Sequence, residues 1–197
     1  MDGPSCFAAG RVTCGRLYAA GEKVVIFSNM DTNDQDEWGP IVEALSSRGY
    51  MALTYAYPCQ ADDQSGVLHD AVAFVRSVGA EKIVLVGASR GGVATVKVAT
   101  DNRPGDWLAG LAAISAPISS YGATFYSDDE LRRIRVPMLL INSERDMCVE
   151  GTCRMPETVV APKELVLYPG ESHGTEIFND SCESLVEKLA IFVERVL

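Results

Sequence analysis

Short runs of apolar residues, many of them β-branched, alternate along the chain with longer segments in which apolar residues recur every three or four positions. The short runs are typical of strands buried on both faces, and the longer segments are typical of helices with one apolar face. The pattern predicts strands at 23–28, 50–57, 83–86, 107–115, 137–142 and 164–168, with an edge strand or hairpin arm at 11–20. It predicts helices at about 39–48, 64–78, 93–99 and 179–196, and a short helix at 128–133.

Strands that alternate with helices through short connections build a mostly parallel, doubly wound sheet, because each crossover places its helix on one face. We therefore predict a three-layer α/β/α sandwich. The 197 residues suffice for one domain with a sizeable core and are few for two, so we expect one domain over residues 1–197. In such a sheet the functional groups lie beyond the carboxyl ends of the strands.

One of the loops after a strand carries a chemical motif. The apolar run at 83–86 is followed by Gly87-Ala88-Ser89-Arg90-Gly91 and then by a predicted helix. Strand, Gly-x-Ser-x-Gly and helix in this order are typical of a nucleophile elbow. The glycines leave room for a sharp turn that holds Ser89 in a strained conformation with its hydroxyl exposed. An ordinary Gly-rich turn with a solvent-facing serine is the alternative.

A serine hydroxyl becomes a nucleophile only beside a base that is itself oriented by a third group. The sequence contains two histidines. His69 falls inside a predicted helix, whereas His173 follows the last predicted strand, so we expect His173 to be the base. The strand before that one is followed by Asp146, which we expect to orient the histidine, with Glu144 as the alternative.

The chain order Ser, acid, His resembles that of the α/β-hydrolase superfamily, and in particular the small dienelactone-hydrolase-like serine esterases. The resemblance extends from position 12 to the end and rests on Gly87-Ala88-Ser89-Arg90-Gly91-Gly92, Asn142-Ser143-Glu144-Arg145-Asp146 and Ser172-His173-Gly174-Thr175. It implies that Ser89 is the nucleophile, Asp146 the acid and His173 the base in the hydrolysis of carboxylic esters through an acyl-enzyme, without a cofactor. The alternatives are a thioesterase or peptidase with the same triad, or a non-catalytic ligand-binding homologue.

The chain departs from these relatives at the first buried strand. Many of them carry His-Gly there, next to a residue whose N–H helps to form the oxyanion hole, whereas this chain has Ser28-Asn29 followed by Met30. Asn tolerates a left-handed backbone better than most residues, so Asn29 could still present the Met30 amide. We expect the N–H groups of Met30 and Arg90 to form the oxyanion hole.

The connection between residues 116 and 137 is short where many relatives insert a lid, which predicts an open site with minimal or no lid, suited to short or small acyl groups. Candidate pocket residues, each of which could instead pack on a neighbouring loop, are Met30, Asn29, Trp38, Tyr57, Tyr121, Phe125 and Tyr126. Acidic residues such as Asp31 and Glu37 are frequent in loops on the predicted catalytic edge, which favours neutral or cationic esters. Arg90 could hold a substrate carboxylate or pair with a nearby aspartate.

Composition narrows the classes of partner. The formal net charge of −10 disfavours nucleic acid and anionic membranes. No apolar run approaches the ~20 residues that span a bilayer, and no signal peptide is visible. We therefore expect a cytoplasmic location, although a mature secreted form would look the same. We expect a small-molecule ester as the substrate, and a monomer or small homo-oligomer.

Six cysteines without a C-x-x-C pair, together with two histidines, make a zinc site unexpected. Cys148 with Cys153, or Cys6 with Cys14, could form a disulfide. Free thiols are the expectation without a signal peptide.

Overall fold

The computed structural model describes residues 5–58, 64–101, 107–120 and 122–197. Within these ranges, eight strands form one sheet in the order β1-β2-β4-β3-β5-β6-β9-β10. The strands are β1 (Ser5–Ala9), β2 (Val12–Tyr18), β3 (Lys23–Ser28), β4 (Met51–Ala56), β5 (Lys82–Ala88), β6 (Leu108–Ile114), β9 (Met138–Ser143) and β10 (Lys163–Tyr168). From β4 to β10 all neighbours pair in parallel, whereas β1 and β2 form an antiparallel hairpin that joins the edge of β4.

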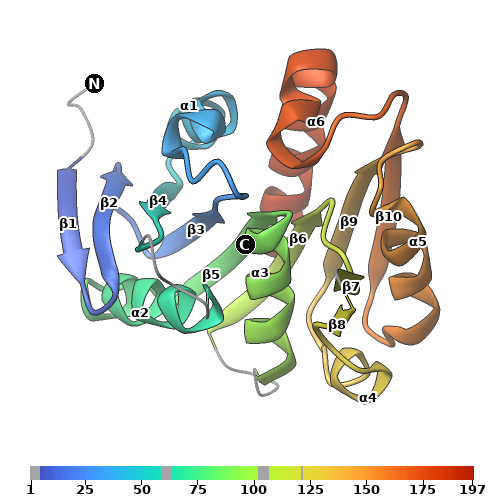
Figure 1. The fold of residues 1–197 in the computed structure, drawn as a ribbon. Coiled ribbons are helices and arrows are strands. Elements are labelled where there is room, and N and C mark those ends of the chain that lie inside the picture. Colours follow the sequence, from blue (N-terminus) through green and yellow to red (C-terminus); the bar gives the residue numbers. More distant parts are fainter. Residues whose placement is uncertain (1–4, 59–63, 102–106, 121) are drawn as a thin grey trace.

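The helices lie on both faces of the sheet (Figure 1), and this confirms the predicted three-layer α/β/α architecture. They are α1 (Gly39–Ser46), α2 (Gln64–Ser77), α3 (Arg90–Asp101), α4 (Asp128–Leu131), α5 (Val149–Thr158) and α6 (Ile177–Val196), with short 3₁₀ turns η1 (Gln35–Trp38) and η2 (Gly174–Glu176). Buried side chains of α1 and α6, such as Leu45 and Leu189, pack on one face of the sheet. Those of α2 and α3, such as Leu68 and Val96, pack on the other face.

The register of the parallel strands brings their carboxyl ends to one edge of the sheet. Gly87 of β5 lies opposite both Ser28 of β3 and Ala113 of β6, and Ser143 of β9 lies opposite Tyr168 of β10. The loops that follow these strands therefore meet at this edge, as expected for an open α/β sheet.

Some elements were not expected from the sequence. They are the edge strand β1, the helix α5, and a small hairpin of β7 (Ser119–Ser120) with β8 (Ala123–Thr124) that lies in the short connection before α4. The helical signal of α5 is weak because Gly151 and Pro156 interrupt it. In the described part of the chain, no helix combines the length and the apolar character needed to cross a membrane.

Candidate active site

Ser89 stands in a strained turn between β5 and α3. Its φ is 50°, in the left-handed region that non-glycine residues rarely adopt. The turn is tight enough that a Cβ on Gly87 would overlap the carbonyl of Gly91, and a Cβ on Gly91 would overlap the carbonyl of Ser28. The Ser89 N–H donates a hydrogen bond of 2.8 Å to the Ile114 carbonyl, which ties the turn to the neighbouring strand. Both glycines of Gly-x-Ser-x-Gly are thus required by close backbone approach.

The three residues expected to work together do meet at this edge. His173 Nε2 lies 2.8 Å from Ser89 Oγ, and His173 Nδ1 lies 2.6 Å from Asp146 Oδ2. Because a carboxylate only accepts, Nδ1 carries the proton in the neutral ring, and Nε2 is free to accept from the serine hydroxyl. The Asp146 side chain is 1% exposed and that of His173 is 25% exposed. The ring is therefore reachable from solvent while its partner is not.

The contact between Asp146 and His173 shifts the pKa of both residues. Burial alone would raise the pKa of Asp146, but hydrogen bonds from His173 and from the Cys148 N–H outweigh it and hold that pKa below its ordinary value. The hydrogen bond to Asp146 raises the pKa of His173 against the effect of burial, and the charges of Glu176 and Asp31 raise it further. This environment favours a protonated imidazole beside an ionised carboxylate.

A buried chain of polar side chains fixes the Asp146 loop. Asn142, at the end of β9, accepts from Ser115 Oγ at 2.7 Å and donates from Nδ2 to Thr152 Oγ1 at 2.9 Å. Thr152 donates in turn to the carbonyl of Cys148 at 3.3 Å, and the Cys148 N–H donates to Asp146 Oδ1 at 2.6 Å. Polar residues at the ends of β6 and β9 and on α5 thus fix the position of Asp146.

The His173 loop is held by contacts on several sides. Ser143 Oγ donates to the carbonyl of Ser172 at 2.7 Å, and the His173 N–H donates to Glu176 at 3.1 Å. Thr175 Oγ1 donates to Glu37 at 2.6 Å, which links this loop to the turn before α1. The loop therefore has a defined position relative to both neighbouring strand ends.

The segment after β3 differs from the expectation. Within residues 29–34 the left-handed backbone falls on Asn33 (φ 55°) and not on Asn29. Asn29 acts through its side chain, which is fully buried, donates to the Tyr55 carbonyl at 2.9 Å and accepts from Trp38 Nε1 at 2.9 Å. The Asn33 side chain bonds both the N–H and the carbonyl of Tyr57, at 2.8 and 3.0 Å. Two asparagines thus fix the Met30 loop against the end of β4.

Most of the suggested pocket residues lie in the interior. Trp38 is fully buried between Phe27 and Phe178, so neither it nor Asn29 presents a surface to substrate as the sequence had suggested. Tyr57 is buried too, and burial raises the pKa of its hydroxyl to about 12.

Aromatic residues of the short connection after β6 also pack inward. Phe125 is half-buried against the core, and Tyr126 is buried with its hydroxyl bonded to the Pro117 carbonyl at 2.7 Å. Tyr121 lies outside the described residues. Met30 is buried beside the His173 loop, where its sulfur lies 3.1 Å from Thr175 Oγ1.

The competing residues make none of the hydrogen bonds that join Ser89, His173 and Asp146. His69 is exposed on α2, and Glu144 is exposed in the loop that contains Asp146. Arg90 pairs with Asp31, at 3.1 Å between Nη1 and Oδ1, so the structure decides between the two roles left open for this arginine. Asp31 belongs to the loop after β3, whereas Arg90 follows β5, so no local pattern in the sequence links the two residues.

One group of possible metal ligands occurs in the described part of the chain: Asp146, Cys148 and His173, whose ligand atoms lie within 4.8 Å of one another. Two of the three are engaged in the hydrogen bond between Asp146 and His173. Among the cysteines whose side chains are described, Cys148, Cys153, Cys14 and Cys182 are free thiols, so no Cys148–Cys153 bridge is present; the side chain of Cys6 lies outside the description.

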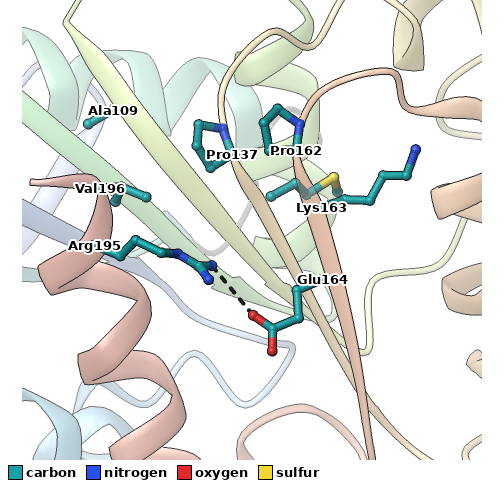
Figure 2. A pocket seen from close by; sticks show the side chains of 8 residues that line it. Ala109, Pro137, Pro162, Lys163, Glu164, Arg195 and Val196 are labelled. Atoms are coloured by element: carbon teal, nitrogen blue, oxygen red, sulfur yellow. Dashed lines mark hydrogen bonds and ion pairs between the residues drawn. The ribbon is translucent and has the colours of Figure 1, made fainter.

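Figure 2 shows a pocket of about 700 Å³ whose lining does not include Ser89, His173 or Asp146. It is lined by Ala109, Pro137, Met138, Pro162, Lys163, Glu164, Arg195 and Val196. Pro137 and Pro162 immediately precede β9 and β10, so this pocket is at the amino ends of the strands, opposite the edge that holds Ser89.

Comparison with known proteins supports the architecture. No family model matches the sequence, and no curated protein matches it. Solved structures do match over nearly the whole chain. An esterase from Pyrococcus furiosus has a TM-score of 0.81 at 16% identity, over 98% of this chain and 90% of that chain. The esterase domain of a Rhodothermus marinus protein has a TM-score of 0.79 at 19% identity, over 98% of this chain and 97% of that chain.

A dienelactone hydrolase from Anabaena variabilis has a TM-score of 0.78 at 17% identity, over the full length of both chains. At these identities the likeness establishes how the elements are arranged and leaves the chemistry to be argued from the side chains. The chain has the α/β-hydrolase fold.

Proposed function

We propose that this protein is a serine hydrolase that cleaves carboxylic esters through an acyl-enzyme intermediate. The observation that carries the proposal is the pair of hydrogen bonds from His173, one to Ser89 Oγ at 2.8 Å and one to Asp146 at 2.6 Å. These distances are those needed for a nucleophile, a base and its orienting acid. The named esterases and the dienelactone hydrolase with the same fold support the substrate class.

In the proposed reaction, Ser89 Oγ attacks the carbonyl carbon of the ester while His173 Nε2 takes the hydroxyl proton. Asp146 stabilises the imidazolium that forms, and His173 then gives the proton to the departing alcohol. Water attacks the acyl-enzyme by the same route and releases the acid. The raised pKa of His173 helps the ring to hold the proton between the two transfers.

The N–H groups of Met30 and Arg90 are the proposed oxyanion donors. Arg90 is the first residue of α3, where N–H groups have no acceptor within the helix. Met30 follows the buried Asn29, whose side-chain bonds fix the loop. Among the described residues, none accepts a hydrogen bond from the Met30 N–H. Each oxyanion donor is worth roughly 10²–10³ in kcat.

The short connection after β6 supports a substrate with a small acyl group. It is occupied by the β7–β8 hairpin and α4, and Tyr126 within it packs inward, so it offers little cover for a long chain. A thioesterase or a peptidase would use the same side chains. A non-catalytic binding protein would need no such alignment of Ser89, His173 and Asp146, which disfavours that alternative.

A fluorophosphonate probe and p-nitrophenyl esters of graded chain length test the proposal. We expect labelling of the wild type, no labelling of Ser89→Ala, and the highest kcat/KM for esters of short acids. Ser77→Ala is the matched control, because Ser77 is an exposed serine whose Oγ bonds only the Phe74 carbonyl one turn earlier. A folded wild type that is neither labelled nor active on any ester would instead favour the binding protein.

A further inference from the structure

An ion pair lies beside the two proposed oxyanion donors. Arg90 Nη1 is 3.1 Å from Asp31 Oδ1. Arg90 directly follows Ser89 in the chain, and Asp31 directly follows Met30, so the pair joins the nucleophile turn to the loop after β3. Arg90 itself supplies one of the proposed oxyanion N–H groups, and Asp31 follows Met30, which supplies the other. Their charges therefore act on whatever surrounds the scissile bond.

Gln64, the first residue of α2, holds the arginine from another side. With its amide in the orientation that satisfies its hydrogen bonds, Gln64 Oε1 accepts from Arg90 Nε and Nη2 at 2.7 and 2.9 Å, and its nitrogen donates to the Arg90 carbonyl at 3.2 Å. Gln64 is buried, so its hydrogen bonds hold the Arg90 side chain in a fixed orientation. A guanidinium is a rigid planar fork, and fixing Nε and Nη2 also fixes the direction of Nη1. The carboxylate of Asp31 lies in the direction in which Nη1 points.

The ion pair is exposed at the mouth of the site. The side chains of Arg90 and Asp31 are 50% and 69% exposed. A pair this exposed adds little to stability, so its placement next to Ser89 has more consequence for what binds than for folding. Asp31 also acts on the His173 ring, together with Glu176. A substrate carboxylate that approached Arg90 would meet the carboxylate of Asp31 already bound there.

We propose that Asp31, by occupying Arg90, makes this site select against esters that carry a negative charge near the scissile bond and in favour of neutral or cationic esters. The proposal rests on the proposed ester hydrolysis and adds the residue that sets its charge preference. In Asp31→Asn, Gln64 still holds the guanidinium, but the negative charge of Asp31 beside it is gone. Anionic esters then lose a repulsion and gain an attraction.

Three esters of one leaving group and similar length test this: p-nitrophenyl pentanoate, mono-p-nitrophenyl adipate and p-nitrophenyl 5-(trimethylammonio)pentanoate. We expect Asp31→Asn to raise the adipate-to-pentanoate ratio of kcat/KM about fivefold at an ionic strength of about 0.01 M, and to lower the ratio for the cationic ester. The change should shrink at about 0.5 M salt, because exposed charges are then screened. Adding Arg90→Gln to Asp31→Asn should reverse the gain on adipate.

Glu81→Gln is the control for net charge. Glu81 is exposed and immediately precedes the seven-residue strand β5, so it lies about 26 Å from Ser89 at the other end of that strand. An adipate-to-pentanoate ratio that Asp31→Asn leaves unchanged, or that Glu81→Gln raises equally, overturns the proposal while leaving Ser89-dependent hydrolysis in place. Hydrolysis that persists in Ser89→Ala overturns both this proposal and the proposed function.

Discussion

Gly174 donates its N–H to the hydroxyl of Ser115 across 2.9 Å, although the two residues are 59 positions apart in the chain. Ser115 is fully buried at the end of β6, with φ of 48°. Its Oγ also donates to Asn142 at 2.7 Å. One hydroxyl therefore joins the residue after His173 to the network behind Asp146. The position of the base relative to the acid depends on this central strand, which contributes no reacting group of its own.

Removing this hydroxyl should misplace the base. We expect Ser115→Ala to lower kcat about 10- to 100-fold with KM changed less than about threefold. The buried Gly174 N–H loses its acceptor, at a cost of about 1–3 kcal/mol, and the Asn142 amide oxygen keeps only the hydrogen bond from the Ser143 N–H. Steady-state kinetics on a p-nitrophenyl ester measures both parameters. The inflection of the pH profile should move as well, since the His173–Asp146 contact changes.

Ser115→Gly separates the hydroxyl from the backbone. Glycine adopts the left-handed conformation of residue 115 without strain but supplies no hydroxyl. If Ser115→Gly retains the wild-type kcat while Ser115→Ala loses it, backbone strain explains the loss and the positioning role of the hydroxyl is wrong.

The choice of Asp146 over Glu144 as the acid can be tested with isosteric changes. Asp146→Asn should lower kcat by about 10⁴, because an amide donates toward Nδ1 and favours the wrong histidine tautomer. Glu144→Gln should stay within about twofold of the wild type, because Glu144 is exposed in the same loop. Equal losses of kcat in both variants would contradict the assignment. Circular dichroism checks that both variants are folded.

The pH dependence follows from the raised pKa of His173. A protonated ring cannot accept the Ser89 proton, so kcat/KM should rise with pH through an inflection above 6.5, the ordinary value for histidine. The hydrogen bond to Asp146 is the largest cause of the upward shift in the pKa of His173, and the charges of Glu176 and Asp31 add to it. Removing either charge should therefore move the inflection down.

Glu176→Gln is the variant to compare with the wild type across pH 5 to 9, because it keeps a side-chain oxygen for the His173 N–H. Its inflection should lie below that of the wild type, and about 1 M salt should narrow the difference. A wild-type inflection below 6.5 would show that the attraction of Asp146 does not outweigh the burial of the ring.

Much of the arrangement could be predicted from local patterns. The parallel strands are nearly continuous apolar runs, and β5 with Ser89 carries the signature of a nucleophile turn. Since carboxyl ends of parallel strands share one edge, residues after β9 and β10 were expected to meet Ser89. The structure brings Asp146 and His173 to hydrogen-bond distance of each other and of that serine.

Other features depend on contacts that no local pattern reveals. Trp38 and Asn29 follow a catalytic-edge strand, as pocket residues would, yet they bond each other in the core. Ser115 gave one usable signal, a polar residue at the end of a central apolar strand, but its partner lies in a distant loop. Arg90 and Asp31 are adjacent only because β3 and β5 pair in parallel, so their link appears once the sheet order is known.

The close approach of the nucleophile turn to β3 predicts a loss of stability in Gly91→Ala. A methyl group at residue 91 would overlap the Ser28 carbonyl, and backbone cannot move aside as a flexible side chain can. Overpacking of this kind costs about 1–3 kcal/mol, and any relief must shift the turn that holds Ser89. Urea denaturation should therefore show a lower midpoint, and kcat should fall even where the variant is fully folded.

Gly21→Ala provides the matched change at a glycine with room for a side chain. Outside its chain neighbours, the nearest atom to a Cβ at Gly21 is the Gly49 carbonyl oxygen at 3.7 Å, an ordinary contact, and the φ of Gly21 is not positive. Gly21→Ala should therefore be neutral or slightly stabilising. If Gly91→Ala kept both the denaturation midpoint and the kcat of Gly21→Ala, the predicted overlap between a methyl group at residue 91 and the Ser28 carbonyl would be wrong.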